Sequence, residues 1–292
     1  MNLQSIGILS IGEMGHACAR VLLRHGARVV TVVNGRSERT RALAKDAGVE
    51  VVDAMKTLLD SVDVVLSLVT PSSARAVCRT VAEAMRGRRD APLYIDANPI
   101  SPTAAAEMAK VIASVGGRFV DGAVIGSATL VGQSTTLYLS GPDAAALREI
   151  ETYGLRVKVV GGEVGQASAL KIFYAGLNKG IAALLIELLV GARRAGILDD
   201  VVDLYNGGFR DLVKRMDAHI TSNSLHARRR SEEMVELADA LRHWGMEPVM
   251  TGAGFIESCP AAAHPAPCRP CRDCQPQDSS SDSRAPTARF VT

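Results

Sequence analysis

The sequence lacks an excess of charge of either sign. Its 292 residues include 33 lysines and arginines against 31 aspartates and glutamates, which gives a formal net charge of +2. Binding to nucleic-acid phosphates needs clustered basic side chains, so this balance argues against a nucleic-acid partner. With 47% hydrophobic residues, the chain is also too apolar for a disordered protein. A small molecule is therefore the expected partner.

Long hydrophobic runs are also absent. The longest apolar stretch, 181–190, is too short to span a bilayer and contains Glu187, so it is typical of a buried helix and we expect no membrane segment. The first residues, MNLQ, lead directly into an apolar strand pattern, without a basic start or a small-residue cleavage site. We therefore expect a cytoplasmic protein.

Short β-rich runs alternate with helical patterns over the first half of the chain. This alternation predicts a parallel α/β domain, which we assign to residues 1–162. The predicted strands span residues 6–10, 28–34, 49–52, 62–69, 93–98, 118–125, 135–140 and 157–160.

The β-rich runs stop after residue 162. One long apolar helical stretch covers 164–196, and further helices end near Gly245, so we predict an all-helical second domain over 163–250. Apolar residues occupy most faces of the long helix, which indicates protein on several sides. A second copy of the chain could cover it, so we expect a homodimer through the helical domain.

Residues 251–292 differ in composition from everything before them. Six of the twelve prolines lie here, beside a run of three serines, so we predict a disordered tail. Four of the six cysteines and one histidine also fall here: Cys259, His264, Cys268, Cys271 and Cys274. Although C-x-x-C-x-x-C could bind a metal, folded zinc modules need apolar residues around the ligands, and this stretch has almost none. We therefore predict no metal site.

A glycine motif follows the first predicted strand. It reads SIGEMG and occupies the position of the G-x-G-x-x-G motif of dinucleotide-binding domains, with serine as its first residue. Bare backbone at Gly12 would let a pyrophosphate approach the helix N-terminus, and Gly15 would let helix and strand pack closely. A tight turn alone could also require Gly12. The predicted cofactor residues are Ser10, Ile11, Gly12, Glu13, Met14 and Gly15.

The end of the second predicted strand bears on the choice between NAD and NADP. A domain selective for NAD usually has an acidic residue there for the ribose 2′-hydroxyl, whereas this chain has Asn34, Arg36 and Ser37. Arg36 offers a cationic fork and Ser37 a hydroxyl to a 2′-phosphate, so we predict NADP in preference to NAD. The alternative is a solvated loop in which Ser37 caps the next helix. Thr70 and Pro71 follow the fourth strand and should border the adenosine ribose or pyrophosphate.

Four segments occur in an order typical of one enzyme family. They read IGILSIGEMG at 6–15, DANPISP at 96–102, DGAVIGS at 121–127 and GQASALK at 165–171. They resemble, in turn, the phosphate loop, the D-x-S-T-x-S-P stretch near the nicotinamide, the D-A-P-V-S-G-G substrate segment and the catalytic-lysine helix of the β-hydroxyacid dehydrogenases. This family includes 6-phosphogluconate and 3-hydroxyisobutyrate dehydrogenases. The resemblance implies a Rossmann-type NAD(P)-binding domain, an all-helical C-terminal domain and usually a dimer.

The same resemblance assigns roles to single residues. Lys171 is the expected proton carrier, since hydride transfer to a carbonyl needs a group that protonates the oxygen. The alternative is an ordinary surface lysine, although the apolar residues around it argue against this. At helical spacing Tyr174 and Asn178 share its face, so Tyr174 could assist proton transfer and Asn178 bind substrate, although core packing of Tyr174 is the alternative. Asn98 replaces the family's serine near the nicotinamide ribose.

The substrate acid group is expected at Ser127 and the backbone of Gly126. The chain departs from the family at Ile125 and Ser127, and also at Ala175, where the family has asparagine. These departures leave the substrate open.

Together these residues predict an NADP-dependent oxidoreductase that interconverts a small β-hydroxy acid and its aldehyde or keto form. Reduction of an imine on the same scaffold and an NADP-binding protein without turnover are the alternatives. The presence of Lys171 favours the alcohol chemistry.

Overall fold

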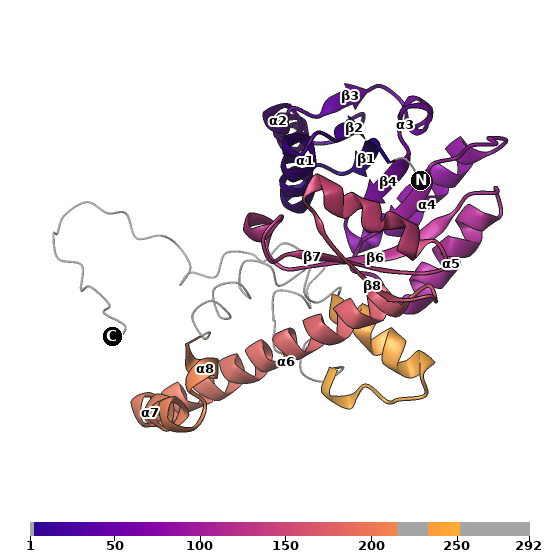
Figure 1. Ribbon diagram of the computed structural model, residues 1–292. Helices are drawn as coiled ribbons and strands as arrows, with labels where there is room; N and C mark the ends of the chain where they lie inside the picture. Colours follow the sequence, from indigo (N-terminus) through magenta and orange to yellow (C-terminus); the bar gives the residue numbers. More distant parts are fainter. Residues whose placement is uncertain (1–2, 215–232, 252–292) are drawn as a thin grey trace.

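The structure, a computed structural model, describes residues 3–214 and 233–251 (Figure 1). The predicted cysteine-rich tail lies outside these residues, apart from Thr251. Eight strands form one sheet in the order β3-β2-β1-β4-β5-β6-β7-β8. Their bounds are β1 (Ser5–Leu9), β2 (Arg28–Val32), β3 (Glu50–Val52), β4 (Val64–Ser67), β5 (Leu93–Asp96), β6 (Phe119–Ile125), β7 (Thr136–Ser140) and β8 (Arg156–Gly161).

Helices cover both faces of the sheet. One face packs on α1 (Glu13–Arg24), α2 (Glu38–Ala47) and the 3₁₀ segment η2 (Ala144–Tyr153). The other face packs on α3 (Met55–Ser61), α4 (Pro71–Met85) and α5 (Pro102–Ala113). The described chain after β8 is helical, with α6 (Gln166–Ala195), α7 (Leu198–Gly208), α8 (Arg210–Val213) and a helix at 233–243. This arrangement confirms the predicted Rossmann-type domain followed by a helical region.

The sheet is not parallel throughout, so the prediction of a parallel sheet is wrong for its last two strands. β1 to β6 are mutually parallel, but β7 is antiparallel to β6, and β8 runs parallel to β7. The physical reason is the short connection between β6 and β7. Residues 126–135 contain only the 3₁₀ turn η1 (Ala128–Leu130), and a parallel crossover needs about a dozen residues or more.

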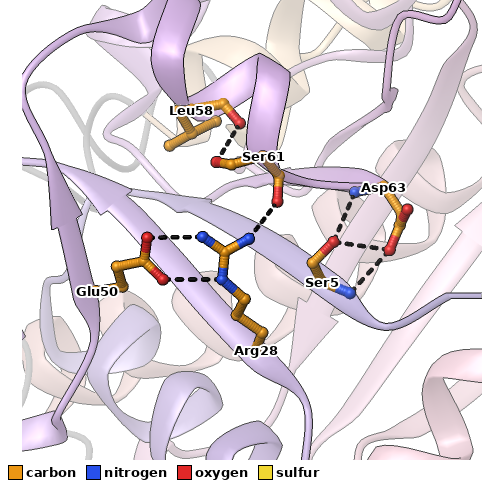
Figure 2. A network of polar contacts seen from close by, with 6 residues as sticks. All are labelled: Ser5, Arg28, Glu50, Leu58, Ser61 and Asp63. Carbon is orange, nitrogen blue, oxygen red and sulfur yellow. Dashed lines mark hydrogen bonds and ion pairs between the residues drawn. The ribbon is translucent and has the colours of Figure 1, made fainter.

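A polar network fixes the edge of the sheet at which the strands begin (Figure 2). The Arg28 guanidinium donates to both carboxylate oxygens of Glu50, at 2.8 and 2.6 Å, and to the Ser61 carbonyl at 2.8 Å. Asp63 accepts from the backbone N–H and the hydroxyl of Ser5 at 2.8 and 2.7 Å. These contacts join the starts of β1, β2 and β3 to the end of α3 and the residue before β4. They leave the opposite edge of the sheet for ligand chemistry.

Buried hydrogen bonds fix the start of α6 against the sheet. Asp121 of β6 accepts from the backbone N–H groups of Gly165 and Ser168, both at 3.0 Å, and from the Ser168 hydroxyl at 2.5 Å. The Ser140 hydroxyl donates to Asp121 at 2.9 Å and accepts from the Ala167 N–H at 3.0 Å. The carboxylate and the hydroxyl thus take up N–H groups that a helix start leaves without partners.

α6 extends away from the sheet towards α7 and α8 (Figure 1). Its length of 30 residues and its composition would allow it to cross a membrane, but core helices of soluble proteins pass the same test, so this is weak evidence. Its described surface is nevertheless rich in apolar side chains. The exposed ones are Leu170, Phe173, Tyr174, Leu177, Leu184, Leu188 and Val190.

Helix 233–243 packs along the first half of α6. Ile172 of α6 and Leu237 share a small apolar cluster, and a Cβ added to Gly176 would lie 2.3 Å from the Leu237 side chain. Trp244, directly after the helix, stacks on Phe173 with ring centroids 5.4 Å apart. Glycine at position 176 therefore permits the close approach of the two helices.

Replacing Asp121 with asparagine should loosen the attachment of α6. The amide keeps the shape of the carboxylate but accepts through one oxygen only, so at least one buried donor loses its acceptor. We expect the free energy of unfolding to fall by about 2 kcal/mol, measured by urea denaturation. The control is Asp143→Asn, because Asp143 pairs with Arg118 near the surface at 3.8 Å. An equal loss in both variants would contradict this account.

Candidate functional site

A row of buried polar side chains crosses the sheet. Ser67, Asp96, Asp121 and Ser140 are register partners on β4, β5, β6 and β7, and each is at most 1% exposed. Ser67 and Asp96 are the last residues of their strands, at the edge where open α/β sheets bind ligands. The row therefore connects this edge to the start of α6.

The loop between β1 and α1 has the geometry of a phosphate loop. Ser10 has φ of +78°, a left-handed conformation that favours glycine, which is the residue usual at this position of the motif. A Cβ on Gly15 would lie 2.2 Å from the Ser10 carbonyl oxygen, so packing requires glycine there. By contrast, a Cβ on Gly12 would meet nothing closer than 3.9 Å. Packing within the chain does not require glycine at 12, which fits close approach of a ligand.

The other residues of this loop differ in what they can offer. Gly12 is the N-cap of α1 and supplies no side-chain acceptor, so the first N–H groups of the helix are left for another partner. Ile11 is fully buried in the core, so only its backbone can contribute. Glu13 is exposed, and Met14 is partly buried against the core. These residues fit a pyrophosphate held by backbone rather than by side chains.

The three residues of the loop after β2 that are predicted to bind the adenosine end of the coenzyme have different contacts. Asn34 donates its side-chain amide to the Asp53 carbonyl, so this group is occupied. Ser37 caps α2 by accepting from the Thr40 N–H at 3.3 Å, which confirms the capping alternative without preventing a contact to a phosphate. Arg36 is half-buried, and within the described residues no acidic side chain pairs with its guanidinium.

Thr70 and Pro71 lie where α4 begins. The Thr70 hydroxyl is exposed and lies 3.2 and 3.0 Å from the hydroxyls of Ser72 and Ser73. Pro71 is the first residue of α4 and is buried. A hydroxyl cluster is thus available at the end of β4, whereas Pro71 contributes packing.

Asn98 is held by the end of β5. Its side-chain NH₂ donates to Asp96 Oδ2 at 2.8 Å and to the Ser67 hydroxyl at 3.1 Å, and its backbone N–H donates to Asp96 Oδ1 at 3.2 Å. The Tyr94 hydroxyl also donates to Asp96 Oδ2, at 3.3 Å. Within the described residues, the buried Oδ1 of Asn98 has no hydrogen-bond partner.

Burial sets the protonation of the two neighbouring carboxyl groups. It raises the pKa of Asp96 to about 7, with hydrogen bonds from Asn98 and Tyr94 opposing the shift and the charge of Asp121 adding to it. Burial also raises the pKa of Asp121, against the hydrogen bonds from Ser168, Ser140 and Gly165. Because Asp121 accepts four hydrogen bonds, it is the better placed of the two to hold the negative charge. Asp96 is therefore the one of the two that takes up a proton more readily.

The predicted substrate segment follows β6. Gly126 has φ of +136°, and a Cβ there would lie 2.2 Å from Thr135 Oγ1, so glycine is required. The Ser127 hydroxyl lies 2.8 Å from Thr129 Oγ1 and accepts from the Thr129 N–H at 3.3 Å, while its carbonyl accepts from Thr135 at 2.6 Å. Both residues are exposed, but the hydroxyl of Ser127 already caps η1.

The three predicted residues of α6 differ in exposure. Lys171 is half-buried, whereas Tyr174 is 58% exposed. Asn178 donates back to the Tyr174 carbonyl at 2.9 Å along the helix. Sequence analysis missed a second lysine, Lys179, which is 8% exposed and pairs with Glu233 of helix 233–243 at 2.6 Å.

Asp96 and Asp121 were also given no role by sequence analysis. The signal was present, because an aspartate ends the apolar run LYID and another interrupts FVDGAV, and buried carboxylates are rare unless they are paired. Within residues 3–214 and 233–251, no group of three or more His, Cys, Asp or Glu side chains could hold a metal ion.

Comparison with known proteins identifies the family. Residues 5–161, more than half of the chain, match the family model described as the NAD binding domain of 6-phosphogluconate dehydrogenase. The chain belongs to the β-hydroxyacid dehydrogenase family. Residues 192–254 match a domain of unknown function. Membership confirms the resemblance and establishes an NAD(P)-binding domain of the dehydrogenase type.

Several relatives match most of this chain. An uncharacterized protein of Methanothermus fervidus is 30% identical over 249 residues, which cover 84% of this chain and 94% of that protein. A solved conserved hypothetical protein of Sinorhizobium meliloti is 31% identical, with a TM-score of 0.70 and 89% of each chain covered. A solved conserved protein of unknown function, described as structurally similar to 3-hydroxyacid dehydrogenases, is 35% identical with a TM-score of 0.67, and covers 85% of this chain and 92% of its own.

More distant matches carry less information. The 3-hydroxyisobutyrate dehydrogenase of Mycobacterium tuberculosis is 20% identical with a TM-score of 0.70, covers 87% of this chain and 91% of its own, and shows the fold alone. The cytokine-like nuclear factor N-PAC of Danio rerio is 25% identical over 196 residues, which are 65% of this chain. The family member spans only 42% of that nuclear factor.

The Asp96 carboxyl should make stability depend on pH. The unfolded carboxyl ionises near pH 3.8 while the folded one keeps its proton to about pH 7. The contribution of Asp96 to stability is therefore largest below pH 4 and falls by about 4 kcal/mol as the pH rises to 7. Urea denaturation of the natural chain and of Asp96→Asn should show this difference.

Asp63→Asn is a control of opposite sign. Although burial raises it, hydrogen bonds from Gln4 and Ser5 leave the pKa of Asp63 lowered overall. Its contribution is therefore present above the unfolded pKa and is lost as the pH falls. The same pH slope in both variants would refute the assignment to Asp96.

Proposed function

We propose that this family member is an NADP-dependent oxidoreductase that interconverts a small β-hydroxy acid and its aldehyde or keto form by hydride transfer. The observation that carries the proposal is the attachment of α6 by Asp121, next to Asp96 and Asn98. Lys171 follows Gly165 by less than two helical turns. An amine of α6 and the ligand-binding edge of the sheet thus belong to one rigid assembly.

The loop after β1 fits the coenzyme. Gly12 leaves open space, Ser10 and Gly15 hold the backbone turn, and the start of α1 has N–H groups to offer a pyrophosphate. Arg36, with Ser37, is the group proposed to bind the 2′-phosphate, and Thr70 to border the ribose. When bound, the nicotinamide supplies or accepts the hydride.

Residues of α6 donate and accept the proton of the reaction. In reduction, the Lys171 ammonium donates a proton to the substrate oxygen as negative charge develops there, and in oxidation its amine accepts one. Tyr174 and Asn178 lie one and two turns further along the same face and assist in proton transfer and substrate binding. Gly126 and Ser127 receive the acid group of the substrate. We also propose a cytoplasmic location, which suits this chemistry.

Replacing Lys171 with methionine tests the proton carrier. The variant should retain binding of NADPH but lose about 100-fold or more in kcat, because methionine fills similar space without a transferable proton. The assay uses NADPH with a panel of small keto acids, semialdehydes and cyclic imines. Lys110→Met, an exposed lysine on α5, is the matched control. Turnover unchanged by Lys171→Met refutes the role, and NADPH binding without turnover on any substrate supports a non-catalytic protein.

Replacing Arg36 with methionine tests the coenzyme preference. The dissociation constant for NADP⁺ should rise by about tenfold or more, because a charge-assisted contact to the 2′-phosphate is lost, while that for NAD⁺ changes little. Both constants can be measured by isothermal titration calorimetry. Arg41→Met, further along α2, is the control. Equal affinity of the unaltered chain for the two coenzymes would remove the role of Arg36.

The exposed apolar face of α6 supports a homodimer. Leu177 and Leu184 are 67% and 51% exposed in the single chain, and a second copy would remove them from water. Sedimentation equilibrium should give twice the mass of one chain, and Leu177→Lys with Leu184→Lys should give monomers. Val51→Lys, at the exposed edge strand β3, should leave the dimer intact. A monomeric unaltered chain would contradict the proposal.

A further inference from the structure

The Asn98 amide has two ends, and only one of them is paired. Its NH₂ donates to Asp96 Oδ2 and to the Ser67 hydroxyl, at 2.8 and 3.1 Å. Its oxygen is buried and has no partner within the described residues. Buried acceptors normally find donors, so an unpaired one beside the ligand-binding edge of the sheet calls for a partner that arrives with a ligand.

The orientation of this amide depends on the charge of Asp96. An ionised carboxylate only accepts, so it holds the NH₂ and turns the oxygen away. A protonated carboxyl can donate instead, as can the Ser67 hydroxyl, and both would then pair with the amide oxygen. The NH₂ would be turned away in that case. An amide must turn over to make this exchange, whereas the serine that the family resemblance implies at this position would only rotate its hydroxyl.

We propose that Asp96 is a positioning residue for the coenzyme: its carboxyl group fixes which end of the Asn98 amide is presented to the bound nicotinamide nucleotide. This inference rests on the proposed function. With Asp96 ionised, Asn98 presents its oxygen to a hydroxyl or amide N–H at the nicotinamide end. This oxygen is buried, so its contact with the coenzyme requires a local shift of the loop between β5 and α5.

The surroundings of Asp96 place its titration near neutral pH. Burial raises its pKa to about 7, and the groups that face it are themselves buried: Tyr94 on the same strand, Asp121 on β6 and Cys78 on α4. Burial raises the pKa of Cys78 to about 12, and it holds that of Tyr94 above its ordinary value, so both stay uncharged. Asp121 accepts four hydrogen bonds, which favour its charged form over that of Asp96. Acidification therefore changes the hydrogen bonds of Asn98 by protonating Asp96.

The first test measures the dissociation constant for NADP⁺ between pH 5.5 and 8.5 by calorimetry. In the unaltered chain it should rise about three- to tenfold on acidification, with a midpoint near 7, because one hydrogen bond to the coenzyme is lost. Asp96→Asn and Asn98→Ser should each remove this component. Titration of the 2′-phosphate is common to all variants and cancels in the comparison. Asp63→Asn, a carboxylate at the far edge of the sheet, is the control and should retain the component.

The second test needs no coenzyme. The side-chain ¹⁵N–¹H signals of Asn98, assigned by their loss in Asn98→Ser, should shift with a midpoint near pH 7 and become independent of pH in Asp96→Asn. A pH component of binding that persists in Asp96→Asn or Asn98→Ser overturns the inference while leaving the proposed function intact. Asn98 signals that ignore pH overturn it as well. Absence of NADP⁺ binding at every pH refutes the proposed function, and with it the role of Asp96 in positioning Asn98 for the coenzyme.

Discussion

The hold of Asp121 on the start of α6 is the constraint on which the arrangement of the site depends. One carboxylate accepts from the N–H groups of Gly165 and Ser168 and from the hydroxyls of Ser140 on β7 and Ser168 on α6, so the helix cannot pivot without leaving several buried donors unpaired. The position of Lys171 relative to the sheet follows from this contact. A long helix that is largely exposed along its later turns is thus anchored at the end where chemistry is proposed.

Burial is the largest cause of the raised pKa of Asp96, and the charge of Asp121 adds to it. Asp121 lies opposite it in register, and two buried carboxylates side by side cannot both be ionised cheaply. Asp121 accepts more hydrogen bonds than Asp96 does, so ionisation is less favourable at Asp96. The attachment of α6 and the raised pKa of Asp96 therefore both depend on the same row of buried polar side chains. Changing either carboxylate would alter the other.

The sequence predicts the fold well because its signals are local. Alternating β-rich runs located the eight described strands, and the alternative interpretation of Ser37 as a helix cap is confirmed. The reversal at β7 was missed because strand direction depends on connection length rather than on residue pattern. The pairing of Lys179 with Glu233 joins segments far apart in the sequence, so no local pattern could reveal it. Asp96 was visible as a charge in an apolar run, but its role depends on contacts with the neighbouring strand, which the sequence alone does not show.

The packing of Trp244 on Phe173 gives the protein a built-in optical reporter. The chain contains a single tryptophan, so its intrinsic emission comes from one place, the contact between α6 and the residue that follows helix 233–243. Any event that separates these helices exposes the indole further to water and moves its emission to longer wavelength. The contact between distant parts of the helical domain can therefore be followed by light, without a label.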